Sequence, residues 1–170
     1  MGMRDGGWVV TGALLVGFVS AARAQAPPAN PPPAVPLAPA IGDVIPSFDT
    51  EGIDGQAQHV GFPKGSPTVV VFFLSGCPAC HKMIPEWNSA FARKPKRLRM
   101  IGVLMDQEPP GFFAATPIAF PVVRAPGREF LQKLKVNRAP VTLRVADGGK
   151  VEDAALGPID PIRLGEFFHP

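Results

Sequence analysis

Cysteine and histidine are scarce in this chain, and the surplus of one charge is small. Only two cysteines and three histidines occur among 170 residues, and the histidines are scattered along the chain. A structural zinc site takes about four such ligands in paired spacing, so the sequence excludes the usual zinc-binding protein and predicts no metal site. The formal net charge of +3 is too small to indicate a nucleic acid or an anionic membrane as partner.

The N-terminal segment, residues 1–24, has the pattern of a secretory signal peptide. Arg4 precedes an apolar stretch over residues 8–19, and small residues follow up to Ala24. The apolar stretch is about a dozen residues long, whereas a bilayer-spanning helix needs roughly 20. We therefore predict export to the periplasm with cleavage after Ala24. The alternative is an uncleaved signal that tethers the protein to the inner membrane.

A proline-rich segment, residues 25–40, follows the signal. It carries no charge and no hydrophobic period, and proline at this density favours an extended polyproline II chain. We predict a linker here instead of a packed element. Hydrophobic periodicity begins at Ile41 and continues to the end, so residues 41–170 are predicted to form one folded domain.

The domain alternates strand and helix patterns. The run TVVVFFL over 68–74 is apolar after its first residue, as is typical of a strand buried on both faces. A helix over 77–93, kinked at Pro85, and a second buried strand over 98–105 complete a parallel strand, helix and strand unit. Also predicted are strands over 120–123, 141–146 and 150–156, helices over 109–115, 127–135 and 160–168, short extended pieces over 42–48 and 56–60, and turns over 49–55 and 147–149.

The two cysteines lie two residues apart at the predicted start of the helix over 77–93. A disulfide that closes so short a loop restricts the unfolded chain little, so a purely structural bridge explains the spacing poorly. At the first turn of a helix the Cys77 sulfur faces free backbone N–H groups and the positive end of the helix dipole, which favour the thiolate. Cys77 is therefore the predicted nucleophile, which forms a mixed disulfide with a partner protein. Cys80 is the predicted resolving thiol, which attacks that mixed disulfide and releases the partner. This pair is the redox group, and no further cofactor is predicted.

The segment VVVFFLSGCPACHKMIP over 69–85 resembles the active-site strand and helix of thioredoxin-like proteins. IGDVIPSF over 41–48, followed by DGQ over 54–56, is similar to the N-terminal extension of the TlpA-like branch. That branch comprises exported bacterial thiol-disulfide oxidoreductases, including the ResA-type and cytochrome c maturation reductases. The resemblance implies an α/β thioredoxin fold: a central mixed β-sheet flanked by helices on both faces, after a TlpA-like extension.

Ala139-Pro140-Val141 resembles the cis-proline loop of the same family. The resemblance implies a cis peptide bond before Pro140 and a Pro140 ring that faces the cysteine pair. Ala139, Gly76 and Pro78 complete the implied surface for a substrate strand. The implied partners are client proteins with cysteines or disulfides and an upstream thiol-disulfide electron donor.

Three positions depart from the family pattern. Gly76 stands where tryptophan usually precedes the first cysteine. Val71 stands where thioredoxins have a buried aspartate that accepts the proton of the second cysteine, and Glu86 and Asp106 are the candidate substitutes. Pro78 directly after the first cysteine is typical of the oxidising DsbA-like proteins, whereas the resemblance as a whole favours a reductase.

Two other functions use the same residues. Cys77 to His81 also spells C-x-x-C-H, the attachment signature of c-type haem, although no later segment offers an obvious methionine ligand loop. A redox-inert or copper-handling binding module that uses the groove around Pro140 is the second alternative. Thiol-disulfide exchange is the preferred interpretation, with His81 as a helix residue beside the site.

Overall fold

The computed structural model describes residues 1, 2 and 37–169. The predicted signal peptide lies outside the described residues except for its first two positions, and so does the predicted linker up to residue 36. Within the described part, no helix is both long and apolar enough to cross a bilayer.

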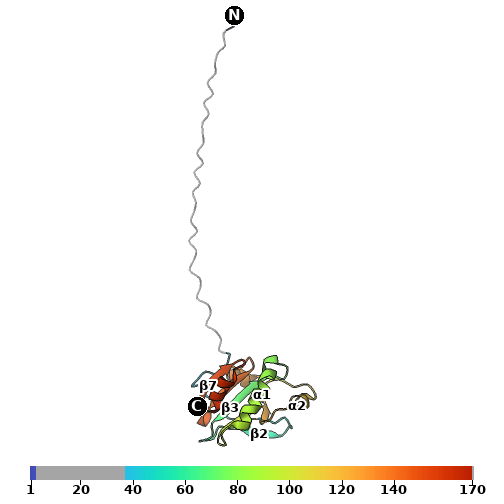
Figure 1. Cartoon of the computed structure of the whole chain (residues 1–170), viewed down its shortest axis with the longest axis vertical. Helices are drawn as coiled ribbons and strands as arrows, with labels where there is room; N and C mark the ends of the chain where they lie inside the picture. Colours follow the sequence, from blue (N-terminus) through green and yellow to red (C-terminus); the bar gives the residue numbers. More distant parts are fainter. Residues whose placement is uncertain (3–36, 170) are drawn as a thin grey trace. The chain divides into compact units, whose positions relative to one another are not determined.

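A five-stranded mixed sheet forms the centre of the fold (Figure 1). Its strand order is β5-β4-β3-β6-β7, in which β3, β4 and β5 run parallel while β6 and β7 add antiparallel strands. The strands are β3 (Thr68–Phe73), β4 (Arg99–Leu104), β5 (Val122–Arg124), β6 (Val141–Val145) and β7 (Val151–Leu156). The helices are α1 (Pro78–Arg93), α2 (Phe112–Ala115), α3 (Arg128–Lys133) and α4 (Pro161–Phe168). This arrangement confirms the predicted fold class.

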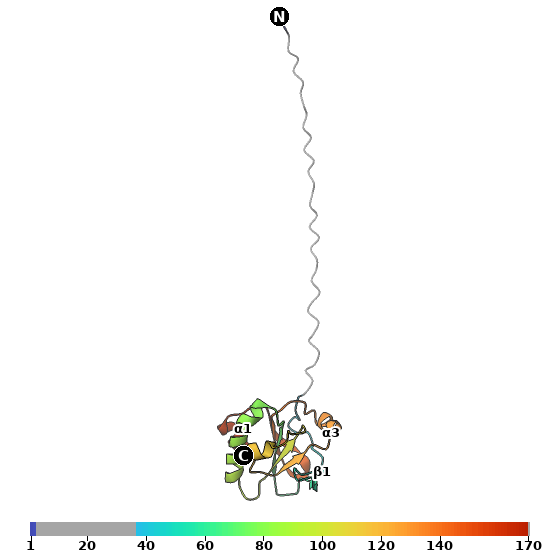
Figure 2. The ribbon, with the colours of Figure 1, turned by 90° about the vertical axis from the view of Figure 1, so that its right-hand side faces the viewer.

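Strand β3 lies between β4 and β6 at the centre of the sheet, and all six of its residues are buried. Its side chains alternate between two hydrophobic clusters, as the pleat requires. Val69, Val71 and Phe73 pack in the cluster that contains α1 and α4, whereas Val70 and Phe72 pack in the cluster on the other face. Figure 2 shows α1 and α3 on opposite sides of the strands. The sheet is therefore covered on both faces, as predicted.

The N-terminal extension differs in detail from the prediction. Strand β1 (Phe48–Glu51) pairs with β2 (Ala57–Val60), so it occupies the start of the expected turn, whereas residues 42–47 of the expected extended piece form one isolated bridge, Val44 to Lys150. Two contacts explain the shift. The Phe48 ring packs 4.5 Å from the Phe130 ring, and the Thr50 hydroxyl donates to the Arg124 carbonyl. These contacts hold β1 against the β5 edge of the sheet.

The predicted turn between β6 and β7 is a short 3-10 turn, η1 (Asp147–Gly149). Gly148 and Gly149 have φ angles of +68° and +89°, which glycine adopts without a steric penalty. A Cβ atom on Gly149 would lie 2.0 Å from the Ile45 carbonyl oxygen. Glycine at this position therefore lets the N-terminal extension pass directly over the hairpin.

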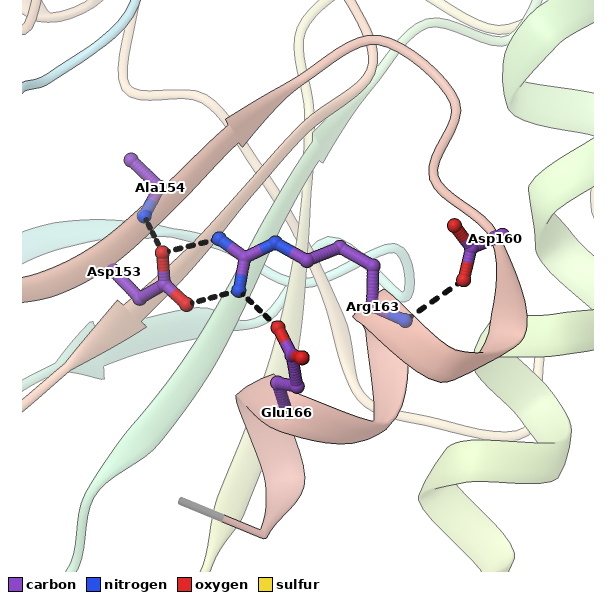
Figure 3. Close-up of polar contacts among 5 residues, drawn as sticks. All are labelled: Asp153, Ala154, Asp160, Arg163 and Glu166. Carbon is purple, nitrogen blue, oxygen red and sulfur yellow. Dashed lines mark hydrogen bonds and ion pairs between the residues drawn. The ribbon is translucent and has the colours of Figure 1, made fainter.

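Helix α4 is capped and anchored by charged side chains (Figure 3). The Asp160 carboxylate accepts a hydrogen bond from the Arg163 N–H at 2.8 Å, which confirms the predicted N-cap. The Arg163 guanidinium holds both oxygens of Asp153 on β7, at 2.5 and 2.7 Å, and one oxygen of Glu166 at 2.7 Å. The contact with Asp153 fixes α4 to β7, and α4 packs in the same hydrophobic cluster as α1.

The Arg163–Asp153 pair predicts a pH-dependent loss of stability in the variant Asp153→Asn. Hydrogen bonds from Arg163 hold the pKa of Asp153 below its ordinary value. The pair therefore stabilises the fold above the ordinary carboxyl pKa of about 4, and its contribution is lost as the pH falls through the lowered value. We expect Asp153→Asn to reduce the free energy of unfolding by about 0.5–1 kcal/mol near pH 7, because solvent partly screens the pair.

Urea unfolding near neutral pH and in acid measures this difference, with Glu166→Gln as the matched control because the Glu166 side chain is 57% exposed. The control should lose less stability than Asp153→Asn. If Asp153→Asn lowers the free energy of unfolding by the same amount in acid, the charge pair is not the source of the loss.

Candidate active site

The cysteine pair lies where β3 meets α1. β3 ends at Phe73, and Cys77 is the N-cap of α1 with an extended backbone. Pro78 occupies the first helical turn, where its missing N–H needs no partner. The Cys77 sulfur accepts a hydrogen bond from the Cys80 N–H at 3.2 Å. The sulfur thus caps a free N–H of the helix start.

The helical period places the two cysteines in different surroundings. The buried face of α1 carries Cys80, Met83, Ile84 and Trp87, at the three- and four-residue spacing of an amphipathic helix. Cys80 has no exposed surface and packs with Val71, whereas Cys77 is half-buried. Only the Cys77 sulfur is therefore accessible enough to attack a partner molecule.

The Cys80 thiol is held in its protonated form. Burial raises its pKa from 9.0 to about 12, and its hydrogen bond to Cys77 and the charges of Cys77 and Asp106 act in the same direction. A hydrogen bond with the Leu74 backbone opposes these effects. At neutral pH Cys80 must therefore give up a proton before it can act as a nucleophile.

The predicted cis-proline loop lies beside the first cysteine. The Ala139–Pro140 peptide bond is cis, as the family resemblance implied. The Cys77 thiol is 3.8 Å from the Ala139 carbonyl oxygen, and Pro140 itself is buried at the start of β6. Ala139 is partly exposed, and Gly76 and Pro78 are exposed. The structure thus brings the two segments together, and the substrate-binding roles of these residues remain predictions.

The chain has an apolar side chain where thioredoxins have a buried aspartate. Val71 is fully buried, and its partner across the sheet is Thr142 on β6. The Thr142 hydroxyl is also fully buried and has no hydrogen-bond partner within the described residues, a feature that the sequence analysis missed. Glu86, one of the two candidate substitutes, lines a cavity of about 210 Å³ between α1 and α4 that does not include either cysteine.

Asp106, the other candidate substitute, lies on the loop after β4. Both of its carboxylate oxygens bind Ser75, a residue of the loop that leads to Cys77. The role of Ser75 was not anticipated from the sequence, because the contact joins two segments that are 31 residues apart.

The geometry does not suit the haem alternative. The His81 Nε2 atom is 2.6 Å from the Ser75 carbonyl oxygen, and the imidazole packs edge-on against Phe112 at 5.8 Å between ring centres. Covalent haem attachment needs both cysteine sulfurs to bond the haem, and Cys80 has no exposed surface. His81 is instead an exposed helix residue that binds the active-site loop, close to the interpretation given above.

A family model described as Redoxin matches residues 40–163. The chain belongs to the Redoxin family. This membership confirms the family resemblance of the segment over 69–85.

The Redoxin relatives agree with the fold and with the predicted enzyme class. Sporulation thiol-disulfide oxidoreductase A of Bacillus subtilis (strain 168) is 25% identical over 162 residues, which cover 91% of this chain and 89% of that protein. A Chlorobium tepidum structure, described as a thiol:disulfide interchange protein DsbE, has a TM-score of 0.67 at 24% identity and covers 76% of this chain and 96% of that one. The thioredoxin domain of a Bacteroides vulgatus thiol-disulfide oxidoreductase has a TM-score of 0.65 at 21% identity and covers 76% and 99%.

These solved structures confirm the thioredoxin fold. The names of the relatives confirm the predicted class of enzyme, thiol-disulfide oxidoreductase, at the level of the family. The roles of individual residues are not part of that confirmation.

The unequal burial of the cysteines predicts selective alkylation of the reduced protein. At about pH 8, iodoacetamide should modify Cys77 alone, because Cys80 is buried and its thiol stays protonated. Peptide mass mapping locates the label, and Cys77→Ser should remain unlabelled until the protein is unfolded. Equal labelling of both cysteines in the folded protein would contradict the assignment.

Proposed function

We propose that this chain is an exported thiol-disulfide oxidoreductase that reduces disulfide bonds in other exported proteins. One observation carries the proposal: a half-buried sulfur accepts an N–H bond at the start of α1, directly beside a cis-proline loop. Cys77 is the nucleophile and Cys80 the resolving thiol. The Redoxin family and the names of its relatives support this class of chemistry.

The reaction consists of two exchanges of sulfur bonds. The Cys77 thiolate attacks one sulfur of the client disulfide, which forms a Cys77–client bond and releases the other client sulfur as a thiolate that takes up a proton. Cys80 then loses its proton and attacks the Cys77 sulfur, so that a Cys77–Cys80 disulfide forms and the client leaves with two thiols. Two electrons pass to the client, and an upstream thiol-disulfide donor restores the reduced pair.

The surface around Cys77 fits an extended client segment. A Cβ atom on Gly76 would have no atom within 4 Å, so the space where relatives carry tryptophan is open. Gly76 and Pro78, which flank Cys77 in the chain, are exposed, and the Ala139 carbonyl oxygen lies 3.8 Å from the Cys77 sulfur. In this proposal the client strand pairs with the backbone beside Pro140, and the open side admits a bulky residue next to the client cysteine.

The signal pattern supports the exported location in this proposal, and that location defines the class of client. The signal pattern over residues 1–24 supports a periplasmic location, with a tether to the inner membrane if the signal is retained. The clients are then exported proteins with reducible disulfides, such as apocytochromes before haem attachment in cytochrome c maturation. The reactive group is the Cys77–Cys80 disulfide, and the reaction uses no other cofactor.

Cysteine variants test the assigned roles. Reduction of insulin by dithiothreitol should be accelerated by the wild type and should fall to the uncatalysed rate in Cys77→Ser, because that variant lacks the attacking sulfur. Cys80→Ser should instead accumulate a mixed disulfide with the client, visible on a non-reducing gel. Full activity of Cys77→Ala would indicate a binding module and would overturn the proposal.

The reduction potential tests the direction. Equilibration with glutathione buffers should give a potential of about −270 mV or lower for a reductant, whereas an oxidant of the DsbA kind has about −120 mV. Quantifying the free thiols at each buffer ratio measures the value. A potential near the oxidising limit would show that the chain introduces disulfides, and that Pro78 indicates the direction better than the overall resemblance does.

A further inference from the structure

The register of the sheet brings two polar residues together behind the cysteine loop. β3 and β4 run parallel, and their last paired residues are Phe73 and Leu104. The Met105 N–H donates to the Phe73 carbonyl at 2.9 Å, so the pairing continues past the strand ends. Two residues beyond each strand end, Ser75 therefore faces Asp106.

Every polar group of Ser75 has a partner. Its N–H donates to the Asp106 carboxylate, at 2.9 Å to Oδ1, and its hydroxyl donates to Oδ2 at 2.8 Å. Its carbonyl oxygen is 2.6 Å from His81 Nε2, and this nitrogen must carry the proton because a carbonyl oxygen can only accept. Ser75 is only 5% exposed. The residue is thus held from β4 on one side and from α1 on the other.

This attachment matters because the next residue is flexible. Gly76 separates Ser75 from Cys77, and a glycine with open space around it restricts the chain little. The Cys77 sulfur caps α1 only if the loop enters the helix at the right angle. Fixing Ser75 therefore limits the positions that the sulfur can take.

We propose that Asp106 is a positioning residue of the dithiol site, which acts through Ser75, with His81 on the opposite side, to hold the Cys77 sulfur over the first turn of α1. The inference rests on the proposed function for its purpose and on the contacts of Ser75 for its geometry. The carboxylate has a second effect, since its charge contributes to the raised pKa of Cys80. Asp106 thus connects the position of one cysteine with the protonation of the other.

Variants at Asp106 separate the hydrogen bonds from the charge. Asp106→Ala removes every hydrogen bond between the carboxylate and Ser75, and Ser75→Ala removes the hydroxyl bond to Oδ2 alone. Asp106→Asn removes the charge and keeps an amide oxygen that can accept the Ser75 N–H. The matched control is Asp54→Asn, which removes an exposed carboxylate that lines the same open cavity as Asp106 and whose own partner is the Gln56 N–H.

The rate of Cys77 alkylation by iodoacetamide is measured in a Cys80→Ala background, which keeps the backbone N–H at residue 80. Asp106→Ala and Ser75→Ala should each slow it about three- to tenfold, as the loss of a hydrogen bond to a charged group would. Asp106→Asn should recover most of the rate, and Asp54→Asn should match the parent. Equal rates in all variants, or an Asp106→Asn as slow as Asp106→Ala, would overturn the positioning role.

The ionisation of Cys80, followed by NMR through the pH dependence of its Cβ chemical shift in a Cys77→Ala background, reports the charge. The ionisable groups whose charges act on Cys80 are Cys77 and Asp106, and His81 follows it on α1. With Cys77 removed, the profile should move to lower pH in Asp106→Asn and stay in place in Asp54→Asn, an effect that a purely structural role would not produce. An unchanged profile in Asp106→Asn would remove the second effect and leave Asp106 without a link to Cys80.

Neither measurement uses a client protein. A wild type that fails to reduce insulin but shows these variant effects would refute the proposed function and leave the positioning role intact. The reverse result would refute the positioning role alone. Thermal unfolding of each variant confirms that the protein is folded. If Asp106→Ala does not fold, the two single variants Asp106→Asn and Ser75→Ala suffice for the test.

Discussion

The hydrogen bond from the Cys80 N–H to the Cys77 sulfur is the contact on which the site depends. A helix start leaves backbone N–H groups without partners, and a side chain at the N-cap satisfies one of them. Here that side chain is the nucleophile itself. Formation of α1 and presentation of the reactive sulfur are therefore one structural event.

The asymmetry of the cysteine pair follows from the geometry of that helix. Cys80 is three residues after the cap, at the first position of the buried face that Ile84 and Trp87 continue. A residue at this position must face the sheet, while the N-cap residue remains at the rim. Burial then keeps the second thiol neutral, and the half-buried cap leaves the first one accessible. Two chemical roles thus arise from one helical turn and a strongly apolar core.

Features that depend on local sequence could be predicted, and those that depend on distant register could not. The apolar run of β3, the proline at the start of α1 and the Asp-Gly-Gly turn each carry their own signal, and all three lie where the pattern placed them. β1 was missed because its polar residues gain their strand character from contacts with the β5 edge and with Phe130. Likewise, nothing in either segment alone shows that Ser75 faces Asp106. Their contact follows from how β3 and β4 align.

Within the described residues, no buried carboxylate lies in the core around Cys80. The buried polar and charged residues of the described part are Thr68, Ser75, Thr142 and Arg144, and none of them is a carboxylate. A carboxylate at position 71 would have to be desolvated within an apolar cluster, at considerable energetic cost. The carboxylate whose charge acts on Cys80 is instead that of Asp106, which is partly exposed and accepts hydrogen bonds from Ser75. The charge of Asp106 therefore acts with burial to raise the pKa of Cys80. The same carboxylate that holds Ser75 in place thus opposes ionisation of the buried thiol.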